Sequence, residues 1–203
     1  MDESKLIEQF KAVSFATLGH FLEEGFADSQ LRAMVPNVKL VGRALTLKLV
    51  GADAIAVNQA LALIQPGDVL VIDTDGDWQH APVGAVTSCA ALCAGAVGIV
   101  VDGAVTDLLE LREAGLPVFA RGTSVLTTKL HGRGDSEINQ PIHCAGVTVH
   151  PGGLVLADDN GVLFLDWQTA AGVIEQALAS DRAEPRLLER LRAGEPVAQV
   201  LRV

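Results

Sequence analysis

The sequence contains few aromatic residues, few cysteines and no cluster of basic residues. Aromatic side chains make up 4% of its 203 residues and tyrosine is absent, whereas hydrophobic residues as a whole make up 49%. The core must therefore be built from Val, Leu, Ile and Ala, which is typical of strands covered on both faces. This length suits one domain with a substantial core, so we expect a single domain over residues 1–203.

The charge is strongly acidic, with a formal net value of -10. Because clustered Lys and Arg bind phosphate backbones, this balance disfavours direct binding of nucleic acid but is compatible with a basic protein partner. No uninterrupted apolar run reaches the roughly 20 residues that span a membrane. The polar, acidic start at residues 1–5 predicts no signal peptide, and an odd, low cysteine count fits a reducing cytoplasm.

Two of the three cysteines, Cys89 and Cys93, are four residues apart on an expected helix and therefore share one face. No further ligands at matching spacing accompany them, as a zinc site would require. We therefore expect both to be small buried hydrophobic side chains.

Several common functional motifs are absent. There is no Gly-x-Gly-x-x-Gly fingerprint, no P-loop and no Gly-x-Ser-x-Gly, which removes support for nucleotide binding and for the simplest hydrolase. The run Asp73–Asp77 lacks the Gly and Glu positions of a calcium loop and indicates an acidic turn. The five histidines are scattered, and only His80 comes shortly before a glycine-led loop.

The chain is organised around the stretch Gly67–Asp107. Two β-branched runs, residues 67–73 and 98–105, flank a helix-length segment of small residues, which predicts strand, loop, helix and strand with a parallel crossover. Open α/β sheets bind ligands beyond the carboxyl ends of their strands. We therefore expect a site where the Gly84 loop meets the Thr106-Asp107 pair.

The remaining pattern predicts an α/β fold with helices at both ends. We expect N-terminal helices within residues 3–25, a core over residues 38–166 and C-terminal helices within residues 168–193. Within the core we expect strands over 38–50, 116–120, 142–150, 154–157 and 162–165, helices over 54–64 and 108–113, and a long polar loop over 121–140.

The Gly84 loop and Asp107 have a chemical and a purely structural interpretation. Free N–H groups at a helix start can hold a carboxylate, and an aspartate after a strand can hold a hard divalent cation directly or through water. Together they would polarise a 2-oxo acid and stabilise an enolate. Alternatively, Gly84 fits a turn and Asp107 caps the helix that follows it.

Six segments, found in order over roughly residues 13–166, carry a resemblance to a known family. These segments are Leu40–Thr46, Pro66–Asp73, Gly98–Gly103, Leu116–Gly122, Val147–Gly152 and Ala157–Val162. The sequence resembles the regulator of RNase E activity (RraA) and 4-hydroxy-4-methyl-2-oxoglutarate aldolase family. The resemblance implies a swivelling β/β/α domain and homotrimers that can pair into hexamers, with the site between subunits.

The resemblance also implies an activity and its residues. Active family members are Mg²⁺- or Mn²⁺-dependent pyruvate aldolases that also decarboxylate oxaloacetate. Their metal ligand corresponds to Asp107, and the arginine that contacts substrate is replaced here by Thr106. Their loop amides that hold the pyruvate carboxylate correspond to those of Gly84, Ala85, Val86 and Thr87.

The sequence departs from the family pattern at four positions. Thr106 cannot supply the cationic fork of Arg, and the family's usual acidic residues are replaced by Ala85, Gly153 and His20. Two functions therefore stay open: a divergent lyase acting on a small 2-oxo acid, and a non-catalytic member that binds a protein, as a ribonuclease regulator does, or a small ligand. A methyltransferase is disfavoured because no glycine-rich adenosylmethionine loop is present.

Overall fold

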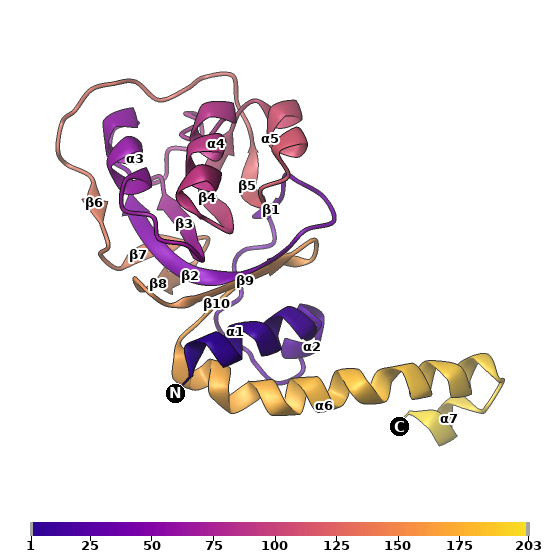
Figure 1. Cartoon of the computed structure of the whole chain (residues 1–203). Helices are drawn as coiled ribbons and strands as arrows, with labels where there is room; N and C mark the ends of the chain where they lie inside the picture. The colour runs from indigo at the N-terminus through magenta and orange to yellow at the C-terminus, as the bar shows by residue number, and fades with distance from the viewer. Residues whose placement is uncertain (1, 202–203) are drawn as a thin grey trace.

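The computed structural model describes residues 2–201 and shows an α/β body with helices at both ends (Figure 1). The main sheet has eight strands in the order β1-β5-β4-β3-β2-β9-β10, with β6 pairing β2 outside this path. Its strands are β1 Arg32–Ala33, β2 Lys39–Lys48, β3 Asp68–Asp73, β4 Gly98–Val105, β5 Val118–Thr123, β6 Glu137–Ile138, β9 Leu154–Asp158 and β10 Gly161–Leu165. A separate hairpin pairs β7 Ile142–Cys144 with β8 Val147–Val149.

The parallel half of the sheet confirms the expected crossover unit. Strands β2, β3, β4 and β5 run parallel, and helices α3 Ala54–Leu61, α4 Ala85–Ala94 and α5 Leu108–Ala114 connect them in turn. All three helices cover the same face of this half (Figure 1). Because each connection is a helical crossover, the carboxyl ends of β3 and β4 meet at one edge, as expected from the sequence.

The expected strands over residues 38–50 form one long strand, β2. Its first half pairs with β9 and, from Arg43 onward, its other edge pairs with β3. Gly42 lies where these pairings meet, and a β-carbon there would be 2.7 Å from the Gly67 carbonyl oxygen and 2.7 Å from Val97 Cγ2. Glycine is therefore required by close packing at this point of the sheet.

This packing predicts the effect of a single methyl group. We expect Gly42→Ala to lower the free energy of unfolding by about 1–3 kcal/mol, because the backbone carbonyl of Gly67 cannot rotate away. Gly172→Ala is the matched control, since that glycine lies within a helix with nothing within 4 Å of an added β-carbon, and it should stabilise by about 0.5–1 kcal/mol. Urea titration measures both variants, and equal stability of the two would contradict this view of Gly42.

Three apolar clusters fill the spaces between layers. One lies between the parallel sheet and α3–α5, a second involves β7, β8 and the inner face of the sheet, and a third lies under the terminal helices. Four phenylalanines belong to the buried clusters, Phe10, Phe15, Phe119 and Phe164, and the rest is mainly aliphatic. The expectation of a Val, Leu, Ile and Ala core is confirmed.

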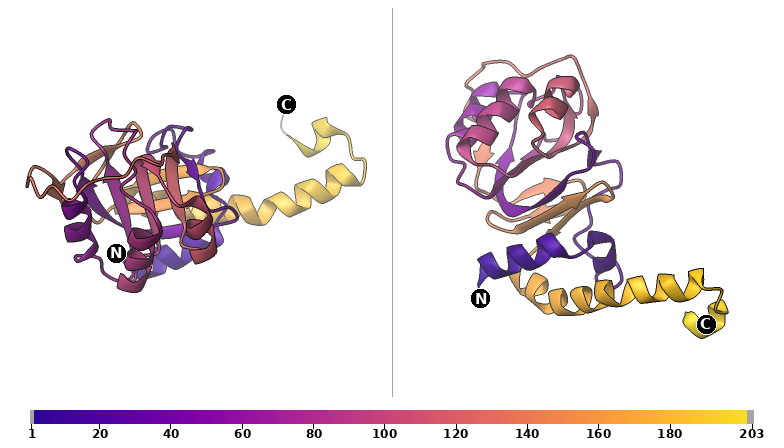
Figure 2. Two further views of the ribbon diagram at one scale, coloured as in Figure 1. Left: turned by 90° about the horizontal axis from the view of Figure 1, so that it is seen from above. Right: turned by 45° about the vertical axis from the view of Figure 1, so that its right-hand side comes forward.

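The terminal helices differ from the expected bounds. The N-terminal helices are α1 Glu3–Ala12 and the short α2 Phe15–Leu18, which ends at Gly19. The two helices expected near the C-terminus are one continuous helix, α6 Trp167–Arg192, followed by α7 Val197–Val200. Pro185 is an exposed residue inside α6, and the helix continues past it although proline lacks the N–H for an intrahelical bond. The far half of α6 projects from the body (Figure 2).

The long polar segment after β5 is held against the body by Asp53. This buried carboxylate accepts from the backbone N–H of Ile55 at 3.0 Å, His131 at 3.1 Å and Arg133 at 2.8 Å. Donation by the N–H groups of Gly132, Arg133, Ile55 and His131 lowers the pKa of Asp53 to about 2. The segment also pairs with Ala81, whose N–H donates to the Leu126 carbonyl at 2.8 Å, and so lies beside the Gly84 loop.

Candidate functional site

The structure brings the Gly84 loop and the Thr106-Asp107 pair side by side. Val83 forms a parallel bridge with Val105, the last residue of β4, and the Thr106 N–H donates to the Val83 carbonyl at 2.9 Å. Gly84 follows as the N-cap of α4, while Asp107 is the N-cap of α5. Two helix starts therefore meet at the carboxyl end of β4.

The Asp107 carboxylate contacts the start of α4. Its Oδ2 accepts from the Ala85 N–H at 2.9 Å, and its Oδ1 accepts from Thr106 Oγ1 at 3.3 Å. Asp107 occupies the N-cap position of α5, as the structural interpretation expects, but its side chain makes no capping bond with that helix. It instead supplies α4 with the capping oxygen that Gly84 lacks.

Gly84 and Asp107 fit each other closely. A β-carbon on Gly84 would lie 2.5 Å from Asp107 Oδ2 and 2.7 Å from Thr106 Cγ2. The Asp107 backbone is left-handed, with φ +54°, a conformation that aspartate tolerates better than most residues. Gly84 itself has an extended backbone, with φ -145° and ψ -160°, and the lack of a side chain there lets the Asp107 carboxylate reach the helix.

The first turn of α4 has the character of an anion-binding site. The N–H groups of Ala85, Val86 and Thr87 lie in the first turn, where an α-helix provides no acceptor. The helix dipole adds partial positive charge at this end. Asp107 and Val86 are exposed, so this helix start is open to solvent.

The donor set limits which metal could bind here. Within residues 2–201, no group of three or more His, Cys, Asp or Glu side chains is arranged to hold a metal ion. Asp107 presents a carboxylate to the start of α4. Mg²⁺ is commonly held by one or two carboxylates and completes its shell with water and substrate oxygens. Asp107 therefore fits such an ion if water and substrate supply the other ligands.

A second charged cluster, which the sequence reasoning did not assign, lies across β4 and β5. Arg121 pairs with Asp102 and, at 3.4 Å, with Asp28, and its guanidinium stacks 4.5 Å from the Trp78 ring centre. Asp102 Oδ2 also accepts from the Ala145 N–H at 2.6 Å. Burial lowers the pKa of Arg121, but the Asp102 and Asp28 carboxylates outweigh it and raise that pKa above the usual value. Through these contacts β4 and β5 hold the three loops that carry Asp28, Trp78 and Ala145.

The cysteines differ from expectation. Cys89 and Cys93 are exposed, whereas Cys144 is buried. The prediction for the first two is wrong because α4 carries no charged residue that marks its outer face, and Ser88 and Ala91 take the inward positions. Burial and the nearby Asp102 and Asp73 carboxylates raise the pKa of Cys144 well above its usual value, so its thiol stays protonated.

His80, the histidine closest in sequence to the loop, is engaged elsewhere. Its Nδ1 lies 2.6 Å from Asp77 Oδ2, and the same carboxylate group accepts from the N–H of Gln79 and His80. The run Asp73–Asp77 is an acidic turn, as expected, because the Asp77 N–H donates to the Thr74 carbonyl at 3.0 Å. No contact joins His80 to Thr106 or Asp107 among the hydrogen bonds of residues 2–201.

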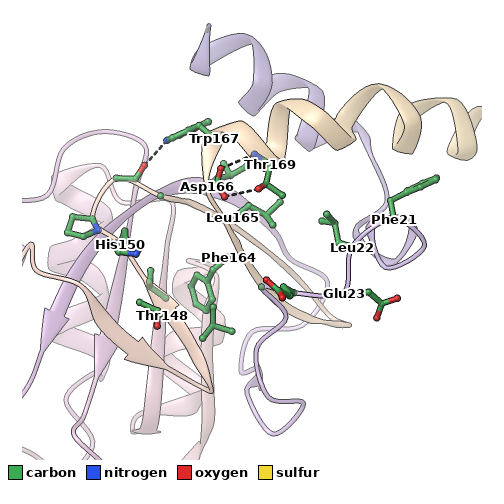
Figure 3. A pocket seen from close by; sticks show the side chains of 18 residues that line it. Phe21, Leu22, Glu23, Thr148, His150, Phe164, Leu165, Asp166, Trp167 and Thr169 are labelled. Atoms are coloured by element: carbon green, nitrogen blue, oxygen red, sulfur yellow. Dashed lines mark hydrogen bonds between the residues drawn. The ribbon is translucent and has the colours of Figure 1, made fainter.

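A groove of about 690 Å³ lies elsewhere on the chain; Figure 3 shows its lining. Its walls come from residues 21–25, 147–154 and 164–167 and from Thr169, and they include Gly153 but no residue of the Gly84 loop. Its Asp166 caps α6 by accepting from the Thr169 N–H at 2.8 Å and hydroxyl at 2.7 Å. Trp167 Nε1 donates to the Gly152 carbonyl at 2.8 Å. Asp166, Thr169 and Trp167 are therefore committed to the fold, whereas Glu23, Thr148 and His150 also line the groove. The candidate site is placed at the Gly84 loop because Asp107 and the first turn of α4 meet there.

Comparison with known proteins identifies the family. The RraA-like family model, described as Aldolase/RraA, matches residues 6–164, and the chain belongs to this family. It is 34% identical over 129 residues to 4-hydroxy-4-methyl-2-oxoglutarate aldolase of Thermus thermophilus, covering 64% of this chain and 77% of that protein. It is 33% identical over 191 residues to a protein of Halalkalibacterium halodurans provisionally named for the same aldolase, covering 92% and 90%.

Solved structures agree with this assignment. The RNA-processing inhibitor RraA from Thermus thermophilis has a TM-score of 0.66 and 30% identity, covering 75% of this chain and 92% of that one. An uncharacterized protein from Pseudomonas syringae has a TM-score of 0.79, 23% identity and coverage of 97% and 92%, and supports the fold. The expected family and α/β fold are therefore confirmed.

The helices were also compared with the requirements of a membrane span. Between residues 2 and 201, none combines sufficient length with sufficient apolarity to cross a bilayer.

Proposed function

We propose that this chain is a divergent, metal-dependent lyase of its family that cleaves a small 2-oxo acid, by an aldolase or oxaloacetate decarboxylase type of reaction. The observation that carries the proposal is the meeting of Asp107 with the first turn of α4, where Asp107 Oδ2 lies 2.9 Å from the Ala85 nitrogen. A carboxylate that could hold a cation and a helix start that could bind a substrate carboxylate are therefore in direct contact. The aldolase names of two relatives support the same class of substrate.

Each part of the site has a role in this proposal. The N–H groups of Ala85, Val86 and Thr87, with the dipole of α4, would bind the substrate carboxylate. Asp107 would hold Mg²⁺ or Mn²⁺, which when bound polarises the 2-oxo group as a Lewis acid. Thr106 Oγ1, 3.3 Å from Asp107 Oδ1, would offer one neutral hydrogen bond in place of the family arginine. We expect slow turnover, since a neutral donor stabilises developing negative charge less than a guanidinium does.

Pyruvate release tests the proposal. Wild type should release pyruvate from 4-hydroxy-4-methyl-2-oxoglutarate or oxaloacetate with Mg²⁺ and lose this activity in a chelator. Asp107→Asn keeps the shape and left-handed backbone but removes the charge, and we expect about a 10²–10³-fold loss. Glu110→Gln is the matched control, because Glu110 is an exposed acid in the first turn of α5. No turnover by wild type, or equal effects of the two variants, would contradict the proposal.

A second candidate function is a non-catalytic protein binder of the ribonuclease-regulator kind. Thr106 and Ala85, in place of the residues that the family resemblance leads one to expect, favour it. One structural neighbour is named as an RNA-processing inhibitor and another, from Streptomyces coelicolor, as a member of an RNase ES inhibitor family. Absence of turnover in both wild type and Thr106→Arg, with intact folding, would favour this function.

We also propose a cytoplasmic location, which the three free cysteines support.

The outer face of α4 supports a homo-oligomer, a trimer or a hexamer, with α4 at an interface. No charged residue occurs in Ala85–Ala94, and Val86 is 84% exposed and Leu92 46% exposed. Val125, in the segment that pairs with Ala81, is 98% exposed. Apolar surface of this kind is typical of a protein interface, and here it adjoins the candidate site.

The cysteines provide a measurement of this interface. In the assembled wild type we expect Cys89 and Cys93 to react slowly with a thiol reagent, and Leu92→Glu to dissociate the assembly and expose both. Cys144 is an internal control because it is buried in the chain itself. Gln176→Glu, an added acid on the exposed side of α6, should leave mass and thiol reactivity unchanged. A monomeric wild type with two rapidly reacting thiols, by light scattering and thiol titration, would contradict the interface.

A further inference from the structure

The two roles proposed for the site compete for the same atoms. Asp107 Oδ2 already occupies the Ala85 N–H that a substrate carboxylate would need. We propose, building on the proposed function, that Asp107 closes the anion site of α4 in the resting chain. A substrate carboxylate can take the Ala85 N–H only after the Asp107 side chain has turned away from it. A divalent cation that drew the Asp107 carboxylate away from Ala85 would favour this open form.

The contacts show that Asp107 is committed to α4 and not to its own helix. Both of its carboxylate oxygens are engaged, one by the Ala85 N–H and one by the Thr106 hydroxyl, and neither bonds to α5. Gly84 leaves space for this approach, because a β-carbon there would lie 2.5 Å from Oδ2. A second anion cannot take the same N–H, and the charge of Asp107 would repel it.

The same contacts show that the closure is reversible. Asp107 is exposed, and its hydrogen-bond partners within residues 2–201 are one backbone N–H and one neutral hydroxyl. No Lys or Arg of the described chain forms an ion pair with it. Rotation of one exposed side chain therefore opens the site without moving β4 or α4. Asp107 acts in this way as a positioning residue that couples cation binding to anion binding.

The effect of Asp107 on anion affinity can be estimated from the strength of its hydrogen bond. A charge-assisted hydrogen bond of ordinary strength keeps such a site closed for about 90–99% of the time. The apparent affinity for an anion falls by the fraction of open molecules. Removing the carboxylate should therefore strengthen metal-free anion binding by about 10- to 100-fold.

The test is calorimetric titration with oxalate in metal-free buffer. Asp107→Gly removes the side chain and takes the left-handed backbone without strain, and we expect it to bind oxalate about 10- to 100-fold more tightly than wild type. Asp107→Asn removes the charge but keeps an oxygen that accepts from Ala85, so its gain should be smaller. Glu110→Gln removes a nearby exposed charge only and should change the affinity by a few-fold at most.

Titration of wild type with Mg²⁺ present separates this proposal from the proposed function. If wild type binds oxalate with Mg²⁺ but Asp107→Gly gains nothing in metal-free buffer, the closure is overturned and the lyase site stands. Equal gains in Asp107→Gly and Asp107→Asn would also overturn it, because charge alone would then explain them. If oxalate binds neither protein under either condition, both proposals are overturned.

Discussion

Thr106→Arg is expected to raise pyruvate release by about 10²–10³-fold over wild type. A guanidinium supplies a fixed cationic fork where charge develops on the 2-oxo oxygen, and one such donor is typically worth this factor. Thr106 is half-buried and its neighbour Asp107 is exposed, so a longer side chain at this position can extend toward solvent. The new cation would also offer the Asp107 carboxylate a partner other than the Ala85 N–H, which opens the anion site.

Two further variants separate the effect of the planar guanidinium and its several N–H donors from the effects of charge and of side-chain size. Thr106→Lys adds the same charge as a single point and should recover only part of the gain. Thr106→Met adds a side chain of comparable length without charge and should recover none. Steady-state pyruvate release with Mg²⁺ ranks the three variants. A Thr106→Arg protein no faster than wild type would show that this pocket has lost the family chemistry at more than one residue.

Arg121→Met is expected to lower the free energy of unfolding by about 2–4 kcal/mol. The Arg121 and Asp102 side chains are only 11% and 15% exposed, and removal of the cation leaves a largely buried carboxylate without its partner. The substitution also removes the stacking on Trp78 and the contact with Asp28. We therefore expect β4, β5 and the loops that they hold to lose stability together.

A double variant identifies the cause of this loss. Asp102→Asn in the Arg121→Met background removes the unpaired charge and should restore part of the stability. Arg186→Met, at an exposed position of α6, is the control and should change stability by less than about 0.5 kcal/mol. Urea titration measures all three. A loss in Arg121→Met no larger than in Arg186→Met would mean that the cluster contributes little.

The parallel half of the fold could be predicted because its signals are local. The β-branched runs of β3 and β4 and the small-residue helix between them specify a crossover that tertiary context did not change. The terminal helices were less predictable. Gly19 ends α2 after four residues, and α6 continues past Pro185, where a separate helix was expected to begin.

The position of the candidate site could be predicted from the sequence, but the contacts between its residues could not. The adjacency of Gly84 and Asp107 follows from neighbouring strand ends, which sequence pattern reveals. The bond between Asp107 and Ala85 depends on a left-handed backbone and on the direction of one side chain, which no spacing rule specifies. The Arg121–Asp102 pair joins residues 19 apart on different strands, and no spacing rule predicts it.

The most direct test of where a 2-oxo acid binds is the change in backbone amide chemical shifts when oxalate and Mg²⁺ are added to the ¹⁵N-labelled protein. We predict the largest changes at Ala85, Val86 and Thr87 and at Thr106 and Asp107, with little change around the groove of residues 21–25 and 147–154. Shifts centred on that groove, or none at α4, would contradict the placement of the site at the Gly84 loop.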